Sequence, residues 1–172
     1  MTAIQTRFKG RYYRSRTEAR YAALFSFCRL PFDYEKEGFW LELGRYLPDF
    51  FLPSLDMWFE VKGALPTCEA TNKCHCLADE TNQRVVMAYG APGWETDLGC
   101  FSPGWHGNGI QALPAFLMQW ISPEIVLLAI EAAQSVRFGE PGNIVPLPLA
   151  QRAPEPKLLL TKTSDGGVDL PF

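Results

Sequence analysis

The most distinctive hydrophobic pattern in the chain is a pair of short apolar runs at residues 46–52 and 57–61. Both runs are rich in aromatic and branched side chains, which favour strands. The segment between them, Pro-Ser-Leu-Asp at 53–56, has the composition of a tight connection. The pattern therefore predicts a β-hairpin in which Leu52 pairs with Met57.

This register places Asp49 directly opposite Glu60 on one face of the hairpin. Because side chains alternate along a strand, Lys62 points to the same face as Glu60. The other face is apolar and is formed by Phe50, Leu52, Met57, Phe59 and Val61. Pro48 cannot donate a ladder hydrogen bond, so we expect an irregular backbone just before Asp49.

Two carboxylates that face each other across a ladder repel unless one is protonated or a cation lies between them. Lys62 can supply part of the missing positive charge, and a hard divalent ion such as Mg²⁺ or Mn²⁺ can supply the rest. The alternative is that Asp49 and Glu60 are ordinary solvent-facing residues of a half-exposed hairpin. The irregular backbone expected at Pro48 favours the cation site.

Helical and extended patterns alternate on both sides of the hairpin. A helix is expected at 15–28, because Ser15 and Glu18 have the spacing of a capping box. The other expected elements of this half are strands at 32–34 and 39–43, a helix at 68–81 and an interior strand at 85–89. A hairpin followed by a helix and a returning strand predicts a mixed α/β sheet.

The second half of the chain has weaker patterns. Residues 90–109 contain six glycines and are expected to form a loop, either a mobile lid or a surface excursion packed by its tryptophans. Helices are expected at 113–120 and 124–138. The prolines after residue 138 predict a Pro-rich tail at 139–172, in which 158–161 is a candidate edge strand.

Composition adds limits to this picture. The chain has 172 residues, 47% of them hydrophobic and 20% charged, which predicts one globular domain at 1–138 followed by the tail. No apolar run approaches the roughly 20 residues needed to span a bilayer. The first ten residues lack the apolar core of a signal peptide. We therefore expect a cytoplasmic protein without a membrane partner.

Five cysteines and no export signal favour reduced thiols over disulfides. Cys68, Cys74, His75 and Cys76 lie close together in the sequence. Their spacing lacks the paired short intervals of structural zinc sites. We therefore favour thiols buried on the helix at 68–81 over a zinc site.

Positive charge is concentrated in the first twenty residues, although the formal net charge of the chain is −3. The basic residues of this segment are Arg7, Lys9, Arg11, Arg14, Arg16 and Arg20. Phe8, Tyr12 and Tyr13 lie among them, and such a mixture suits a phosphate backbone and exposed bases. The alternative is a solvated, partly frayed N-terminal arm.

Lys73, on the helix expected at 68–81, has two candidate partners. One is Glu69, four residues earlier on the same helix, and the other is a phosphate of the nucleic acid.

Several of these features occur together in one known superfamily. Pro48-Asp49, ten intervening residues and then Glu60-Val61-Lys62 resembles the signature of the PD-(D/E)XK nucleases. The neighbouring segments that strengthen the resemblance are YRSRTEARYAALF at 13–25, Tyr34-Glu35, and Glu69 with Lys73. In combination they are similar to small nucleases carried by phages and mobile elements, closely over the first half of the chain and weakly over the remainder.

The resemblance implies a restriction-endonuclease-like fold, in which helices flank a mixed β-sheet, and a metal-dependent DNA endonuclease activity. In that family Asp49, Glu60 and the Val61 carbonyl would hold one or two Mg²⁺ or Mn²⁺ ions, and Lys62 would orient a water or stabilise developing charge. The resemblance also offers Glu18 a place in the metal shell. That role competes with the capping box, and we favour the metal shell because Glu18 shares a helical face with Ala22 and Phe25.

Two other functions are compatible with the same fold. One is a nucleic-acid-binding protein without catalysis, and the other is a transposition or assembly subunit that cuts only with a partner. A pure binder gains affinity by losing acids beside the phosphates, so the complete set of Asp49, Glu60 and Lys62 favours the nuclease. We expect nucleic acid, DNA above all, as the partner, together with a homodimer or a further protein.

Overall fold

The computed structural model describes residues 4–138, and the expected tail at 139–172, with its strand at 158–161, lies outside them. Within the described residues, a mixed sheet has the strand order β10 (Trp105–Ala112), β9 (Asp97–Ser102), β8 (Arg84–Tyr89), β7 (Met57–Lys62), β6 (Phe50–Leu52) and β3 (Asp33–Tyr34). β7 and β8 run parallel, whereas the other neighbours are antiparallel. The predicted mixed α/β fold is confirmed.

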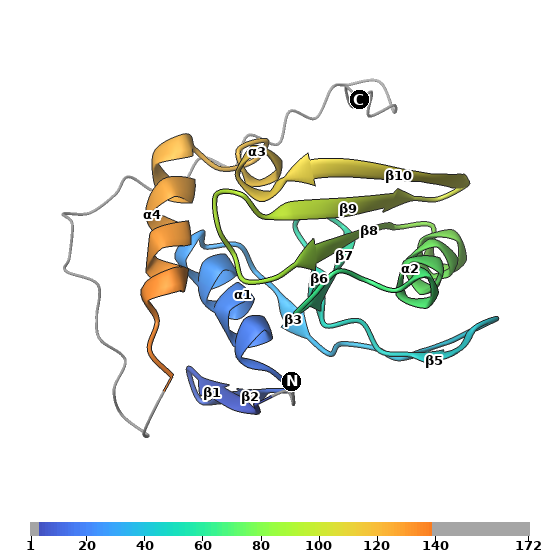
Figure 1. Ribbon diagram of the computed structural model, residues 1–172, viewed down its shortest axis with the longest axis horizontal. Coiled ribbons are helices and arrows are strands. Elements are labelled where there is room, and N and C mark those ends of the chain that lie inside the picture. The colour runs from blue at the N-terminus through green and yellow to red at the C-terminus, as the bar shows by residue number, and fades with distance from the viewer. Residues whose placement is uncertain (1–3, 139–172) are drawn as a thin grey trace.

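Helices cover both faces of this sheet (Figure 1). α1 (Arg16–Phe27) and α4 (Pro123–Ser135) pack against each other on one face, and α3 (Leu113–Leu117) lies beside β10. α2 (Cys68–Thr81) packs against β8 and β9 on the opposite face. None of the helices within residues 4–138 is both long and apolar enough to cross a membrane.

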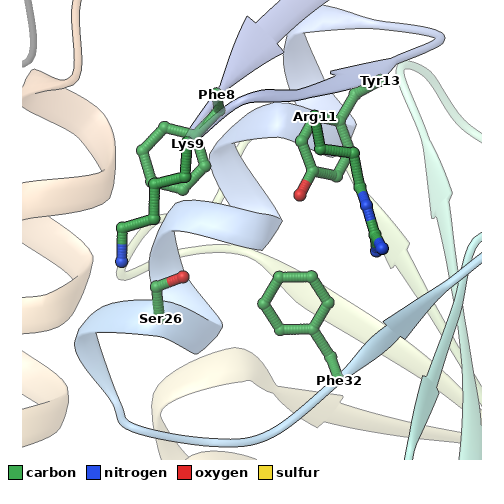
Figure 2. Close-up of a pocket in the computed structure, with 6 residues that line it drawn as sticks. All are labelled: Phe8, Lys9, Arg11, Tyr13, Ser26 and Phe32. Carbon is green, nitrogen blue, oxygen red and sulfur yellow. The ribbon is translucent and has the colours of Figure 1, made fainter.

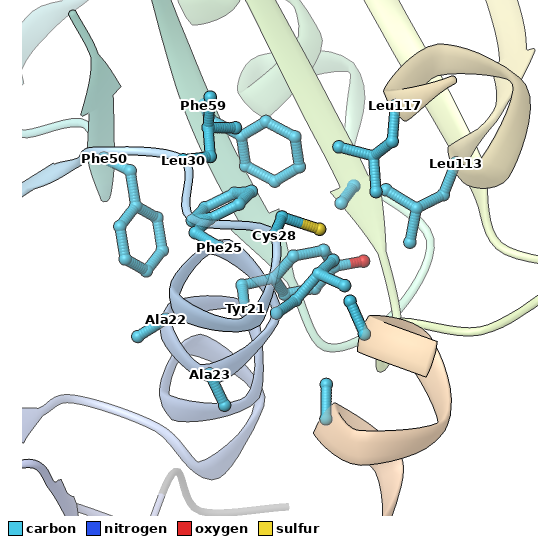
Figure 3. Packing of buried hydrophobic residues seen from close by; sticks show 14 of the residues in the cluster. Tyr21, Ala22, Ala23, Phe25, Cys28, Leu30, Phe50, Phe59, Leu113 and Leu117 are labelled. Atoms are coloured by element: carbon cyan, nitrogen blue, oxygen red, sulfur yellow. The ribbon is translucent and has the colours of Figure 1, made fainter. Parts of the chain in front are cut away.

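The predicted hairpin is confirmed in its register, with Leu52 paired to Met57 and Phe50 paired to Phe59. All five side chains of its expected apolar face belong to the core under α1. Figure 3 shows Phe50 and Phe59 next to Phe25 of that helix. The opposite face is also buried, because Phe51 and Trp58 pack in a second core under α2.

Helix boundaries in the first half follow the local sequence. Ser15 caps α1, and its Oγ accepts a hydrogen bond from the Glu18 amide at 3.1 Å. Thr67 caps α2 in the same way, through the Ala70 amide. α2 ends at Asn82, which adopts the left-handed conformation that stops a helix. Both helices therefore lie where the pattern predicts them.

The apolar run at 46–52 is not one strand. β4 (Phe39–Leu41) and β5 (Gly44–Tyr46) form a separate two-stranded sheet, and β6 begins only at Phe50. The intervening residues include Pro48, which has no amide hydrogen for a ladder. The irregularity expected just before Asp49 is confirmed.

The prediction of a loop at 90–109 is wrong. Most of this segment forms β9 and β10, an antiparallel hairpin that extends the main sheet. β9 contributes to both cores, with Leu98 in the core under α1 and Phe101 in the core under α2. A buried glycine, Gly99, lies between them where a larger side chain meets Tyr89 and Phe101. The glycines therefore permit close packing in a sheet instead of marking a lid.

Two further boundaries differ from the prediction. The helix expected at 113–120 ends at Leu117, and the helix expected at 124–138 spans Pro123–Ser135. Ser122 occupies the N-cap position of α4, but its side chain makes no capping hydrogen bond.

The N-terminal segment is folded and does not fray within the described residues. β1 (Thr6–Phe8) and β2 (Arg11–Tyr13) form a hairpin that packs on α1. Phe8 and Tyr13 are buried in the core, whereas Arg7 and Tyr12 pair on the exposed side. The frayed-arm alternative is wrong for residues 4–14.

Candidate functional site

Asp49 and Glu60 lie just beyond the last ladder pair of β6 and β7. Beyond that pair, backbone amides donate to the two carboxylates instead of to carbonyls of the neighbouring strand. The Asp49 amide donates to Glu60 Oε2 at 3.2 Å, and the Val61 amide donates to Asp49 Oδ2 at 2.7 Å. Both carboxylates are buried, with exposed fractions of 2% for Asp49 and 3% for Glu60. The expected juxtaposition of the two acids is present, through these side-chain bonds instead of a ladder pair.

Arg14 lies at the centre of the acids. Its Nη2 contacts Asp49 Oδ1 at 2.5 Å and its Nε contacts Glu35 Oε1 at 2.7 Å. The same Nε lies 3.9 Å from Glu18 Oε2. A guanidinium presents several donors in a fixed plane, so one side chain can bridge acids from three segments of the chain. Arg14 was expected on a phosphate-binding arm, but the structure places it in the carboxylate cluster.

Glu18 belongs to the same cluster, with an exposed fraction of 7%. Its Oε2 accepts hydrogen bonds from the Tyr34 hydroxyl at 2.5 Å and from the Arg14 amide at 3.1 Å. A full capping box instead directs the carboxylate to the amide of Ser15. The Ser15 hydroxyl still caps the helix, so the cap and the position of Glu18 in the cluster are compatible.

Tyr34 and Glu35 reach the site from the end of β3, and neither is among the site residues predicted from the sequence. Glu35 adopts a positive φ of 48°, which turns the chain after the strand. Its amide donates to the Asp49 carbonyl at 2.8 Å, while its carboxylate holds Arg14. In the sequence, only the resemblance of the Tyr34-Glu35 pair to known nucleases pointed to these two residues.

Lys62 completes the group of residues expected from the motif. Its Nζ donates to Glu60 Oε1 at 2.6 Å. Burial lowers the pKa of Lys62, but the charge and hydrogen bond of Glu60 and the charge of Asp49 together raise it by more, so the net pKa is raised. The side chain is therefore protonated at neutral pH and carries a positive charge into the site.

The cluster is short of positive charge despite Arg14 and Lys62. Burial raises the pKa of Asp49 well above its ordinary value, and the charges of Glu60 and Glu18 raise it further. The Val61 amide and Arg14 lower it, but by less. Another cation beside Asp49 would stabilise its ionised form.

An open cleft of about 690 Å³ leads to these residues. The first turns of α2 form one wall through Thr67, Glu69, Ala70 and Lys73, and Arg14 and Glu18 form part of another. Lys73 Nζ pairs with Glu69 Oε1 at 2.7 Å, as the helical spacing predicts. Because Lys73 also lines the cleft, it is in place to contact a phosphate there.

The donor atoms fit a hard cation better than zinc. Within residues 4–138, no three His, Cys, Asp or Glu side chains are placed to hold one metal ion together, Asp49, Glu60 and Glu18 included, and all five cysteines are free. Zinc sites need such convergent ligands. Mg²⁺ differs, since it is commonly bound by one or two carboxylates and completes its shell with water and phosphate oxygens. The buried pair of Asp49 and Glu60 in an open cleft matches that requirement.

The other basic residues expected to bind nucleic acid lie outside the acidic cluster. Arg7, Lys9 and Arg11 are exposed on the β1–β2 hairpin, and Arg16 is exposed at the start of α1. Lys62, Arg45 and Lys73 line the cleft itself. Arg14 directly follows the basic hairpin in the chain and contacts Asp49, so it connects the basic N-terminal residues to the acidic cluster.

Comparison of the chain with protein-family models, with curated proteins and with solved structures finds no match.

Proposed function

We propose that this chain is a metal-dependent nuclease with a restriction-endonuclease-like fold, and that it acts as a DNA endonuclease. The observation that carries the proposal is the group of Asp49, Glu60 and Lys62 at an open cleft, with both acids buried. Burying two acids side by side is costly, because each loses its hydration and they repel each other. Acids arranged in this way are typical of functional sites.

Asp49 and Glu60 would hold the cation through their carboxylate oxygens, with the Val61 carbonyl as a third donor and Glu18 beside them. A bound Mg²⁺ or Mn²⁺ supplies positive charge that binds the scissile phosphate and lowers the pKa of a water molecule. The hydrogen bond from the Val61 amide fixes the Asp49 carboxylate, so its second oxygen has a defined direction.

Lys62 acts as a charged donor in this proposal. Because its pKa is raised, the ammonium group is not a base at neutral pH. It orients the attacking water or stabilises the charge that develops on the phosphate oxygens. Glu60 holds the ammonium group in place through the 2.6 Å contact.

The alternative is a nucleic-acid-binding protein without catalysis. One observation favours it, namely that Arg14 already neutralises part of the charge on Asp49. In a binder this contact would be permanent and the cleft would need no metal. In the nuclease, Arg14 must release Asp49, and its half-exposed side chain allows that movement.

A cleavage panel separates the two functions. Labelled single-stranded, duplex and branched DNA, with matching RNA, is incubated with the purified protein in Mg²⁺, in Mn²⁺ and in EDTA. The nuclease cuts at least one substrate with metal and none in EDTA, and Asp49→Ala removes the activity. Binding of the substrates without cleavage under any of these conditions would instead establish the binder.

A further inference from the structure

A second, smaller pocket lies between the β1–β2 hairpin and α1 (Figure 2). Its volume is about 270 Å³, and it is lined by Phe8, Lys9, Arg11, Tyr13, Ser26 and Phe32. Its side chains are aromatic, basic or hydroxyl-bearing, and no acid lines it. None of them belongs to the acidic cluster, so the cleft around Asp49 does not account for this pocket.

The pocket is built on fixed groups. Phe8 and Tyr13 are buried, and Phe32 packs against Phe25 and Phe50 with ring centroids 5.8 Å and 5.5 Å apart. Lys9 and Gly10 form the turn of the hairpin with positive φ angles of 46° and 83°. Positive φ at both turn residues is the type I′ geometry, the tightest common hairpin connection. The turn therefore holds Lys9 at a defined place on the rim.

The donors around the pocket suit an anion attached to a flat apolar group. In Figure 2, Lys9 and Arg11 flank the space and the Tyr13 hydroxyl projects into it. Lysine and arginine side chains bind phosphates through charge-assisted hydrogen bonds. Aromatic side chains stack on nucleobases regardless of sequence. A phosphate joined to a base is the ligand that uses both sets of groups.

The size of the pocket narrows the ligand further. The volume of about 270 Å³ is just below the roughly 300–1,000 Å³ of sites for small molecules, so the pocket has room for one nucleotide at most. A base inside a duplex is stacked on both faces and paired along one edge. It therefore cannot contact aromatic side chains in a pocket unless it leaves the helix. The ligand is therefore an unpaired nucleotide.

The pocket is also close to the cleft along the chain. Arg11 on the pocket belongs to β2, and Arg14 in the acidic cluster directly follows that strand. They are three residues apart in the chain, which is at most about 10 Å at ~3.3 Å per residue. A single strand that reaches Arg14 in the cleft can therefore also reach the pocket.

We propose that this pocket binds one unpaired nucleotide of the strand that enters the cleft, with its phosphate on Lys9 and Arg11 and its base against Phe32, whose ring is partly exposed whereas that of Phe8 is buried. The assignment rests on the proposed nuclease function for its link to the cleft. It specifies the substrate class as nucleic acid that is single-stranded near the cleavage position, as in a flap, a junction or a free strand.

The first test measures nucleotide binding without metal. Deoxyadenosine monophosphate is titrated in EDTA into labelled protein and followed by NMR, with inorganic phosphate and a phosphoserine peptide as separate ligands. We expect the nucleotide to shift the ring signals of Phe8 and Phe32 and to bind more tightly than the other two. Equal binding of inorganic phosphate, tighter binding of the peptide, or no ring shifts would overturn the proposal.

Two arginines of the same hairpin provide matched variants. Arg11→Gln removes a charge from the pocket, whereas Arg7→Gln removes the same charge from the exposed side, where Arg7 pairs with Tyr12. We expect Arg11→Gln to weaken binding of the mononucleotide about tenfold, as for a lost charge-assisted bond. Arg7 does not line the pocket and can contact only the backbone of a longer strand, so Arg7→Gln should change mononucleotide binding less than twofold. Equal losses of affinity in the two variants would show that nucleotide binding depends on general electrostatic attraction, and would overturn the pocket as a specific site. Thermal melting confirms that both variants fold.

The second test uses strands and separates this proposal from the nuclease. Binding of a labelled single strand and of its duplex is compared by fluorescence anisotropy in EDTA. The parent protein is expected to prefer the single strand, and Arg11→Gln to lose most of that preference. Because these assays contain no metal, a protein that never cleaves can still bind the nucleotide. Conversely, a protein that cleaves without any single-strand preference would overturn the pocket alone.

Discussion

Arg14 supplies the positive charge that the acids around Asp49 share. It is the residue on which Glu18, Glu35 and Asp49 converge, and it contacts the Asp49 oxygen that a cation would use. In the absence of metal the guanidinium supplies positive charge where the acids need it. In the proposed function a divalent ion and Arg14 would therefore compete for Asp49, and metal binding would shift the guanidinium to another partner.

Removal of Arg14 is expected to raise the affinity of the protein for metal. In Arg14→Gln, Asp49 loses its ion pair, so a divalent cation meets less competition and a more negative site. We expect about tenfold tighter binding of Mn²⁺, measured by isothermal titration calorimetry without nucleic acid; one such factor corresponds to about 1.4 kcal/mol.

Arg45→Gln is the matched control for that measurement, because Arg45 lines the same cleft but is not part of the ion pairs around Asp49. Its metal affinity is expected to stay within twofold of the parent value. Unchanged or weaker Mn²⁺ binding by Arg14→Gln would contradict the competition.

Glu18 offers a test of whether its charge or only its hydrogen bonds matter. Glu18→Gln keeps an oxygen that accepts from the Tyr34 hydroxyl and the Arg14 amide, but it removes the charge beside Asp49. We expect cleavage to fall at least tenfold, with the free energy of unfolding changed by less than about 0.5 kcal/mol. Glu69→Gln, at the exposed rim of the cleft, serves as the control. Full activity of Glu18→Gln over a range of Mg²⁺ concentrations would leave Glu18 a purely structural role.

At the scale of elements, the predictions held where local sequence dictates structure. The β6–β7 hairpin has strand-forming side chains on both sides of a short connection, so its register follows from alternation alone. α1 and α2 each begin at a hydroxyl residue that caps the helix. These signals are contained within a dozen residues, and the fold leaves them unchanged.

The predictions failed where packing between neighbouring strands decides the structure. In β9 and β10 the glycines resemble a loop, yet they lie in the main sheet because neighbouring side chains fill the space above them. No local pattern records that Tyr89 and Phe101 cover Gly99. For the same reason, the run at 46–52 could not show that β5 pairs with β4 instead of continuing into β6.

The β9–β10 hairpin can be tested by adding one methyl group. A Cβ at Gly99 would overlap the Tyr89 hydroxyl and lie 3.3 Å from the Phe101 ring, so at least one of these side chains must shift. We expect Gly99→Ala to lower the free energy of unfolding by about 1–3 kcal/mol, the usual cost of overpacking. Urea denaturation measures this change. Gly63→Ala is the control, since no atom lies within 4 Å of its Cβ position. Equal stability of the two variants would argue against this strand.

At the scale of the whole molecule, part of the site was accessible from the sequence. Asp49, Glu60 and Lys62 belong to one hairpin, so alternation is enough to bring them together. Arg14, Tyr34 and Glu35 come from β2, β3 and their ends, and only the folded chain shows that they join Glu18 and Asp49 in one cluster. The sequence assigned Arg14 by composition to a basic arm, because the partners that neutralise it are distant in the chain.

An acidic protein must approach a polyanion through a local basic surface. Arg7, Lys9 and Arg11 are exposed on the N-terminal hairpin, and each phosphate they neutralise releases counterions on binding. We expect the triple change to Gln to flatten the slope of log K against log salt by about 0.7–0.9 for each lost contact. The slope is measured by anisotropy with Ca²⁺ in place of Mg²⁺.

Substitution is preferable to truncation in this experiment, because removing the residues before Ser15 also removes Arg14 and the packing of Phe8 and Tyr13. Cleavage position is expected to stay the same in the triple variant, since phosphate contacts position a substrate without reading its sequence. An unchanged salt slope would place the contact surface elsewhere, with Lys73 as the next residue to test.

The most direct test of the account is the rate of Mg²⁺-dependent cleavage by Asp49→Asn under single-turnover conditions. Asparagine keeps the shape of the side chain and an oxygen that can accept from the Val61 amide, but it removes the charge that would hold the cation. The account predicts a loss of at least about a hundredfold, comparable to removing one group that stabilises a transition state. Glu69→Gln keeps the parent rate. Cleavage by Asp49→Asn at the parent rate, in the same Mg²⁺, would contradict the account.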